Sequence, residues 1–442
     1  MDSGKDDNAT VPSRAVTGWT VGLICVAIFA GGVIVSALLH DREPESTTAT
    51  STAPGRSYVT PPVAFPVQIP GCTVVEPPAK GGLTSRMTTT DLSYDNPAYP
   101  WFSGPKAVAM SQALRDALPQ DAEIAFAPVD RSLLFQPILA FPGESADQPG
   151  PDGWTRASGT LLRGGSAGKL SVSVRQSAVP VPPCVAGDLI ERRHLADGTT
   201  VDVQDTWYEI GGVRTLSRAA RAYLLDGSAV TAAATDGTDA ADHSGTVPMT
   251  LDDLAAVATA PGLRVTAPVP PGTLDVPESC GNVFEKTGTV DEGVARRLDA
   301  VLARIPLKGL SLDRPLGQLR PPESAASGVC QVVRVTTPGR QSRLSVAITV
   351  GQHLPDASAT SAGYGESVTS RQLPDGTVVE NRESRYSAGS GAQAIPKTQR
   401  TVTVTRRSGT RVEVASTADD PTEPLSIEQL EEIAMTPDLE VR

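Results

Sequence analysis

Hydrophobic and polar residues follow two different periods along the chain, and the same order of periods occurs twice. In each half, apolar residues at helical spacing come first and the pattern ends at a proline (residues 107–119 and 294–306). Runs of alternating apolar and polar residues follow, which is typical of half-buried strands, and glycine-containing turns separate them. We therefore expect each half to contain a helix followed by antiparallel hairpins.

The two halves also end alike. TLDDLAAVATAPGLRV (residues 250–265) and SIEQLEEIAMTPDLEV (residues 426–441) have apolar residues and a proline in matching places. Thr250 and Ser426 stand where a hydroxyl caps a helix, and a carboxylate or amide follows three residues later to return the hydrogen bond. A second helix is therefore predicted to close each half.

This duplication predicts the domain organisation. The expected fold class is α+β: a single N-terminal transmembrane helix followed by two tandem homologous domains, each an antiparallel sheet with two helices. The predicted divisions are a short cytoplasmic tail (1–18), the transmembrane helix (19–39), a Thr/Ser/Pro-rich stalk (40–71), the first repeat (72–268), a proline-rich linker (269–279) and the second repeat (280–442).

The membrane helix is predicted from one apolar segment. Residues 19–39 contain no Asp, Glu, Lys or Arg. At about 1.5 Å per helical residue this length crosses a bilayer once. A cleaved signal peptide is the alternative interpretation. We expect a single-pass protein of the cell membrane with a cytoplasmic N-terminus and an extracytoplasmic C-terminal bulk.

Cysteine usage favours the same compartment. Apart from Cys25, each repeat contains two cysteines: Cys72 with Cys184, and Cys280 with Cys330. An even pair in each unit indicates disulfides formed in an oxidising compartment. Four cysteines can pair in three ways, and buried free thiols are the alternative to any pairing.

The order of these features resembles a group of uncharacterised actinobacterial single-pass membrane proteins with a duplicated extracytoplasmic domain. The shared features are a short tail, one apolar span, a Thr/Pro stalk and repeats that contain Asp-Gly-Thr (residues 197–199 and 375–377). The chain also uses arginine far more than lysine, as proteins of GC-rich actinobacteria do. The resemblance implies a place in the cell envelope and names no activity.

No catalytic, cofactor or nucleic-acid motif is evident. Gly164–Gly168 matches the G-x-S-x-G pattern around Ser166, but an alternating strand follows it, which favours a hairpin turn over a nucleophile elbow. The net charge of −12 comes without a basic stripe, so we expect no nucleic-acid partner. We also expect no cofactor.

Acidic residues gather before the closing helix of the first repeat. Asp236, Asp239 and Asp242, with His243 beside them, could offer carboxylate oxygens to Ca²⁺, although the frame of an EF-hand is missing. The alternative is that they are solvated residues near a helix N-terminus, where negative charge is favourable. We predict no metal site here.

An aromatic segment distinguishes the first repeat from the second. Tyr94, Tyr99, Trp101 and Phe102 lie in an insertion that the second repeat lacks. Rigid aromatic side chains on a loop are typical of a recognition surface, so these four are the predicted ligand-binding residues. The alternative is a lid that folds back over the local core.

The sequence thus predicts a membrane-anchored extracytoplasmic binding or scaffolding module of the bacterial envelope, without catalysis. Its partner would be an envelope protein, a glycan or a lipid. A transmembrane sensor that acts through a partner protein is the alternative, and a hydrolase that uses Ser166 or another site is the third hypothesis.

Overall fold

The computed structural model describes most of the chain beyond its N-terminal segment. The described residues are 58–78, 89–90, 93–140, 153–177, 180–238, 243–280, 288–307, 309–323, 328–357, 361–363, 365–388 and 394–441. The apolar segment 19–39, Cys25 and His40 lie outside them.

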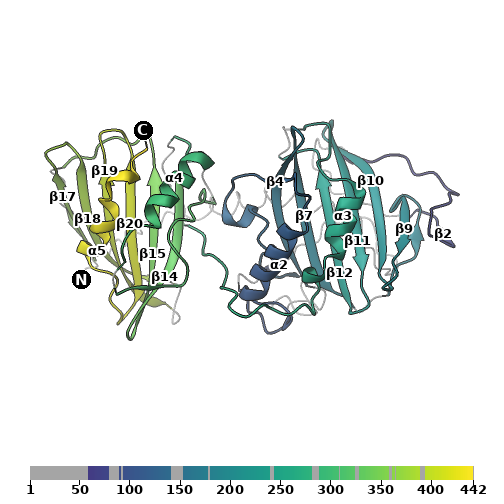
Figure 1. Cartoon of the computed structure of the whole chain (residues 1–442), viewed down its shortest axis with the longest axis horizontal. Helices are drawn as coiled ribbons and strands as arrows, with labels where there is room; N and C mark the ends of the chain where they lie inside the picture. Colours follow the sequence, from purple (N-terminus) through teal and green to yellow (C-terminus); the bar gives the residue numbers. More distant parts are fainter. Residues whose placement is uncertain are drawn as a thin grey trace, which may run out of the picture.

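Two large antiparallel sheets lie side by side (Figure 1). Long strands in the first sheet are β6 (Trp154–Arg163), β7 (Ser166–Gln176), β10 (Thr200–Ile210), β11 (Val213–Tyr223) and β12 (Ser228–Thr235). Its short strands are β1 (Tyr58–Val59), β3 (Thr89–Thr90), β4 (Glu123–Ile124), β5 (Leu139–Ala140) and β9 (Glu191–His194). Because β1 pairs with β10, residues predicted to belong to the stalk form one edge of this sheet.

The second sheet is built from the C-terminal half. Its strands are β13 (Ser311–Leu312), β14 (Val329–Thr337), β15 (Arg340–Thr349), β16 (Ser361–Gly363), β17 (Glu366–Gln372), β18 (Val378–Ala388), β19 (Ile395–Thr405) and β20 (Arg411–Asp419). A separate parallel pair consists of β2 (Val75–Glu76) and β8 (Cys184–Val185).

The long strands of the two sheets have the same spatial order. In the first sheet it is β6-β7-β12-β11-β10, with β9 paired to the outer side of β10. In the second it is β14-β15-β20-β19-β18-β17. The predicted hairpins β6–β7, β14–β15 and β19–β20 are all confirmed.

Two helices pack on one face of each sheet (Figure 1). They are α2 (Gly104–Asp116) and α3 (Leu251–Thr259) on the first sheet, and α4 (Glu292–Leu302) and α5 (Ile427–Ala434) on the second. Short 3-10 turns occur at Val129–Arg131, Pro261–Leu263 and Pro437–Leu439. The predicted capping boxes at Thr250 and Ser426 are both present.

Each sheet has its own hydrophobic core beneath its helices. The first core includes Met110, Leu114, Phe135, Leu170 and Leu254. The second includes Leu298, Val346, Val404, Val414 and Leu430. Apolar residues at every second strand position supply the sheet side of each core, so the opposite sheet face is left to polar residues.

The predicted α+β class with a transmembrane helix is wrong. The described residues form twenty strands but only four α-helices, of which the longest, α2, has 13 residues. None of the described helices is long and apolar enough to cross a membrane. The helices are short because each needs to cover only the middle of a wide sheet, whose consecutive hairpins account for most of the ordered chain.

Candidate functional site

The predicted aromatic surface is not a surface. The side chains of Tyr99 and Phe102 are only 4% and 3% exposed and belong to the first core. Tyr94 and Trp101 pack against that core half-buried, with ring centroids 6.1 and 5.4 Å from that of Phe102. Burial raises the pKa of the Tyr94 hydroxyl, and the nearby charge of Asp275 adds to the effect. The lid interpretation therefore describes these residues, and the prediction of exposed ligand-binding aromatics is corrected.

Both predicted cysteine pairs form disulfides. Cys72–Cys184 fastens the chain before β2 to β8, in a small cluster with Ile69 and Leu189. Cys280–Cys330 fastens the end of the linker to β14. The two bonds therefore occupy different places in the two halves, although the surrounding strand order is the same.

The serine of the G-x-S-x-G pattern begins a strand. Gly164 and Gly165 form the tight turn between β6 and β7, with φ of 57° and 81°, and Ser166 opens β7. Positive φ at both positions suits a two-residue hairpin turn and explains the two glycines. This geometry is that of a hairpin turn, not of a turn from a strand into a helix.

A buried carboxylate and a histidine meet in the loop after β12. His243 Nδ1 lies 3.3 Å from Asp236 Oδ1, which also accepts a hydrogen bond from the backbone N–H of Leu216. Asp239 and Asp242 lie outside the described residues. Within the described ranges, no three His, Cys, Asp or Glu side chains come together as metal ligands would. The pair fastens the loop to β11, which is a structural role.

Charged, hydroxyl and aromatic side chains gather on the face of the first sheet that points away from α2 and α3. We call it the first open face. Strand pairing places Arg156 of β6 beside Ser173, Ser173 beside Thr231, and Thr231 beside Arg221. The same row continues to Asp202 of β10 and Arg192 of β9. Neighbouring positions in a row are about 5 Å apart, so these side chains share one surface.

Positive charge dominates the first open face. Alternation along β4, β6, β7, β9, β10, β11 and β12 places five cationic side chains there and two carboxylates, those of Asp202 and Glu123: the cations are Arg156, Lys169, Arg175, Arg192 and Arg221. Asp202 already pairs with Arg192, at 2.6 Å. This excess is notable in a chain whose net charge is −12, because it is concentrated on one face.

Arg156 is the least compensated of these cations. Its side chain is half-buried and its Nε is buried without a hydrogen-bond partner. Burial lowers the pKa of its guanidinium. Among the described residues, no carboxylate forms an ion pair with it, whereas the buried Arg314 pairs with Asp313 at 3.1 Å. A desolvated charge without a counter-ion is unfavourable, which makes this position a candidate for an external anion.

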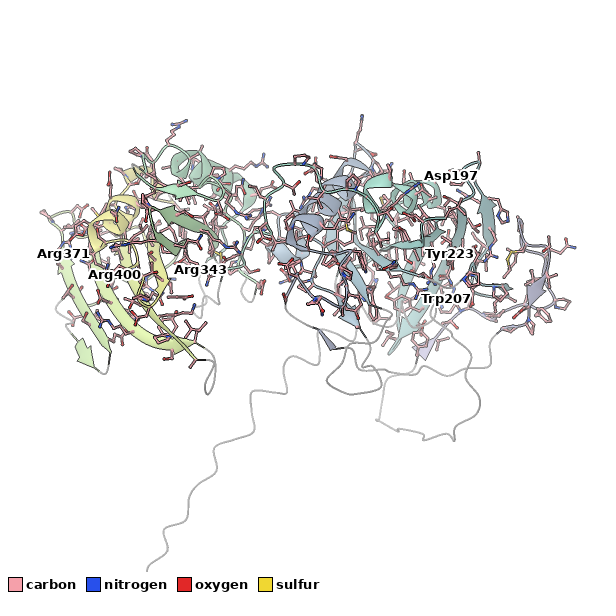
Figure 2. All side chains as sticks on the ribbon, turned by 90° about the horizontal axis from the view of Figure 1, so that it is seen from below. Asp197, Trp207, Tyr223, Arg343, Arg371 and Arg400 are labelled. Carbon is pink, nitrogen blue, oxygen red and sulfur yellow. A yellow bond between two sulfur atoms is a disulfide. The ribbon has the colours of Figure 1, made fainter. Side chains whose placement is uncertain are left out.

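Aromatic side chains border the arginines. The Arg221 guanidinium carbon lies 5.2 Å from the centroid of the Tyr223 ring, and burial raises the pKa of the Tyr223 hydroxyl to about 12. Trp154 lies in the same row as Tyr223, beside Arg175. In Figure 2 the helices lie along the upper side of both halves, and Tyr223 is labelled on the first sheet below them. The face thus offers cations, hydroxyls and ring surfaces together.

The equivalent face of the second sheet, the second open face, carries a different charge pattern. Its cations are Arg334, Arg343, Arg382, Lys397 and Arg411, and its carboxylates are Glu366, Glu380, Glu413 and Asp419. The linker adds Glu278, which pairs with both Arg334 and Arg343. Five cations are thus nearly balanced by four carboxylates of the same face.

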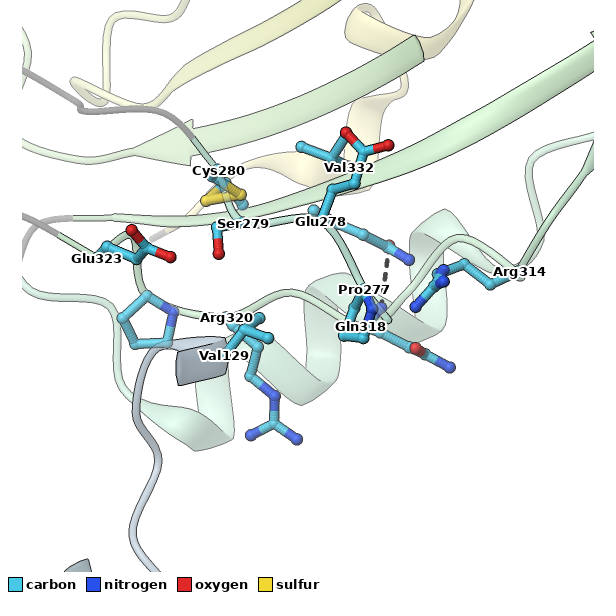
Figure 3. A pocket seen from close by; sticks show the side chains of 13 residues that line it. Val129, Pro277, Glu278, Ser279, Cys280, Arg314, Gln318, Arg320, Glu323 and Val332 are labelled. Carbon is cyan, nitrogen blue, oxygen red and sulfur yellow. Dashed lines mark hydrogen bonds between the residues drawn. A yellow bond between two sulfur atoms is a disulfide. The ribbon is translucent and has the colours of Figure 1, made fainter. Parts of the chain in front are cut away.

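The junction between the halves holds a hollow that is too small for a ligand. Its lining includes Val129 from the first half, Glu278 from the linker, and the Cys280–Cys330 disulfide and Arg320 from the second half (Figure 3). The cavity of about 20 Å³ has room for roughly one water molecule. Another hollow, between α5 and the segment just after α4, measures about 70 Å³. Both are far below the several hundred Å³ typical of small-molecule sites, roughly 300 or more.

The sequence contains a signal for the first open face, although no motif marks it. Arg156, Arg175 and Arg221 each stand at a polar position of an alternating strand. Collecting the charges of the polar positions, strand by strand, would have revealed the excess of arginine. Their meeting in adjacent rows needed the pairing of four strands, which local patterns do not give.

No family model matches this chain, and no curated protein matches it. Among solved structures it is similar to the di-domain ARO/CYC StfQ from the steffimycin biosynthetic pathway, at 10% identity over 80% of this chain and 90% of that chain, with a TM-score of 0.13. It is also similar to MucB in complex with MucA(peri), at 9% identity over 74% of this chain and 96% of that one, with a TM-score of 0.12. With TM-scores this low, neither likeness supports a conclusion about fold or function.

Proposed function

We propose that this protein is a non-catalytic binding module of an extracytoplasmic, oxidising compartment, and that it binds an acidic partner through the first open face. The observation that carries the proposal is the ratio of five cations to two carboxylates on that face, against five to four on the second open face. A surface with this imbalance attracts anionic polymers and orients them before contact.

Two further observations support the proposal. The disulfides Cys72–Cys184 and Cys280–Cys330 are typical of proteins that fold outside the cytosol. The second open face, with its balanced charge, fits a supporting role for the second half. A binding role is favoured over hydrolysis because Ser166 lies in a hairpin and His243 is engaged with Asp236.

The test is binding of the intact chain to immobilised polyglutamate and to dextran sulfate, measured by surface plasmon resonance across a salt series. We expect binding that weakens as salt rises, because the attraction between surface charges is screened. Arg175→Gln combined with Lys169→Gln should weaken it at least about tenfold, a change of about 1.4 kcal/mol.

The matched control is on the second sheet. Arg382→Gln combined with Lys397→Gln removes the same charge from the second open face, where carboxylates lie beside the cations. Binding should stay within about twofold of the wild type. An equal loss in both double variants would show that net charge alone drives binding. That result, or no binding to either polymer, would refute the proposal.

A further inference from the structure

We propose that the first open face contains, between β6 and β7, a site for a single phosphate-type oxyanion that is held by the Arg156 guanidinium. This inference rests on the proposed function and names the chemistry of its ligand. The ligand group is a phosphate or sulfate, either free or carried by a lipid or polymer.

The placement of three side chains defines the site. Arg156 lies directly across from Ser173, and Arg175 lies two residues further along β7, next to Trp154. Directly opposed side chains have Cβ atoms about 5 Å apart, and diagonal neighbours about 7 to 8 Å. Both guanidinium groups can therefore reach the volume above Ser173, whose hydroxyl is a third donor.

The state of Arg156 shows that this volume suits an anion. Its Nε is buried without a partner, and no described residue supplies a carboxylate. Arg192, at the other end of the row on β9, differs because it donates to both carboxylate oxygens of Asp202, at 2.6 and 2.8 Å. Arg192 thus has a counter-ion within the protein, whereas Arg156 can accept an anion from solution as its counter-ion.

Geometry selects an oxyanion over a neutral ligand. A guanidinium offers a planar pair of N–H donors that matches two oxygens of a phosphate, sulfate or carboxylate. A hydroxyl donor and a second cation beside it favour a tetrahedral group with more than two oxygens and more than one negative charge. Phosphate and sulfate groups both offer at least three oxygens in a tetrahedral arrangement, and the free ions and phosphate monoesters carry close to two negative charges, whereas a carboxylate has two oxygens and one charge.

The duplication supplies an internal comparison for this site. Counting from the hairpin turn, Arg156 corresponds to Cys330 and Ser173 to Ala347, which are likewise paired across β14 and β15. In the second sheet the place of the guanidinium is thus taken by the Cys280–Cys330 disulfide. The second half has neither the cation nor the hydroxyl, so it should bind no oxyanion at this position.

The experiment is calorimetric titration of the intact chain with inorganic phosphate, with sulfate, and with vesicles that contain phosphatidic acid or only phosphatidylcholine. Arg156→Gln should weaken phosphate binding at least about tenfold, and Arg156→Lys should weaken it less because the charge remains. Arg382→Gln on the second sheet should leave the affinity within about twofold. Binding of phosphatidic acid vesicles without binding of free phosphate would assign the group to a lipid.

A labelling measurement covers the case in which the Arg156 variants do not fold. Phenylglyoxal modifies accessible arginines of the wild-type protein, and mass spectrometry identifies the modified positions. Phosphate should slow modification of Arg156 at least about threefold and leave Arg382 unchanged. No phosphate, sulfate or phosphatidic acid binding, an unaltered affinity in Arg156→Gln, or no protection of Arg156 would each overturn the site. Retained polyglutamate binding in Arg156→Gln would show that the broader proposal survives without it.

Discussion

The first and second sheets share a strand order but not a surface. Apolar residues at alternate positions face α2 and α3 in one sheet and α4 and α5 in the other, and each half closes with a capping box. On the open faces the alternating strand pattern requires polar residues but does not fix their charge. The charges of the two open faces therefore differ. The comparison shows that the apolar pattern specifies only the core face of each sheet. The open face can therefore acquire a binding role without a change of fold.

The largest expected effects on stability come from the two disulfides. Cys72–Cys184 closes a loop with a sequence separation of 112, and Cys280–Cys330 one of 50. In the chain-entropy model, loss of the first bond destabilises its half by about 5 kcal/mol and loss of the second by about 4 kcal/mol. Urea unfolding of the two Cys→Ser double variants would measure both losses. Equal stability of either variant and the wild type would contradict the model.

The next largest effect is the loss of stability when a residue in one of the two separate cores is truncated. Phe135 is fully buried in the first core and Leu298 in the second. Phe135→Ala should destabilise by about 4 kcal/mol and Leu298→Ala by about 3 kcal/mol, because each leaves a cavity. Hydrogen exchange should show protection lost in the first sheet for Phe135→Ala and in the second for Leu298→Ala. Loss across both sheets in either variant would mean that the halves unfold as one unit.

A buried lysine makes the first half sensitive to alkaline pH. Lys106, in the first turn of α2, is 3% exposed and donates to the carbonyl oxygens of Arg264 and Ala267. Burial lowers its pKa from 10.5 to about 8, against the opposing charge of Asp226. Val294 occupies the matching position of α4, three residues after the cap.

The sign of the effect follows from proton binding. Between pH 8 and 10.5 the unfolded state binds more protons at Lys106 than the folded state, so stability rises with pH in that window. Urea unfolding at pH 7.5 and 9.5 should show a gain of about 2 kcal/mol for the wild type. Lys106→Val should abolish the gain. A wild type with unchanged or falling stability would show that the lysine keeps its ordinary pKa.

The charge difference between the open faces can be reversed by design. Glu380 and Glu413 lie in one row of the second open face, on either side of Thr403. Glu380→Gln combined with Glu413→Gln leaves five cations and two carboxylates there. We expect the double variant to bind polyglutamate up to about tenfold more tightly than the wild type, about 1.4 kcal/mol, at low salt. No gain would mean that the rows of the first open face contribute more than charge.

How much of the molecule the sequence could predict depends on how local each feature is. The hairpin β19–β20 and the caps at Thr250 and Ser426 were predicted because each depends on residues close in sequence. The sequence left open whether Tyr99 is exposed or folds back as a lid, because the answer depends on contacts with a core formed later in the chain. The row from Arg156 to Arg221 was missed because it requires the register of four strands, of which two come from the far side of the DGT turn.

The smallest expected effect is also the one in which the halves should agree. Thr250 accepts from the backbone N–H of Asp253 at 3.1 Å, and Ser426 from that of Gln429 at 3.3 Å, and each partner side chain returns a hydrogen bond. Thr250→Ala and Ser426→Ala should therefore each destabilise by about 1 kcal/mol, and Thr250→Ser and Ser426→Thr by much less. Asp253 also pairs with Arg163 at 2.6 Å, an interaction that Gln429 cannot make. The free-energy losses in Thr250→Ala and Ser426→Ala could differ by more than about 1 kcal/mol. That result would show that the ion pair between Arg163 and Asp253 changes how much the cap contributes to the stability of α3, so that the two closing helices are not stabilised in the same way.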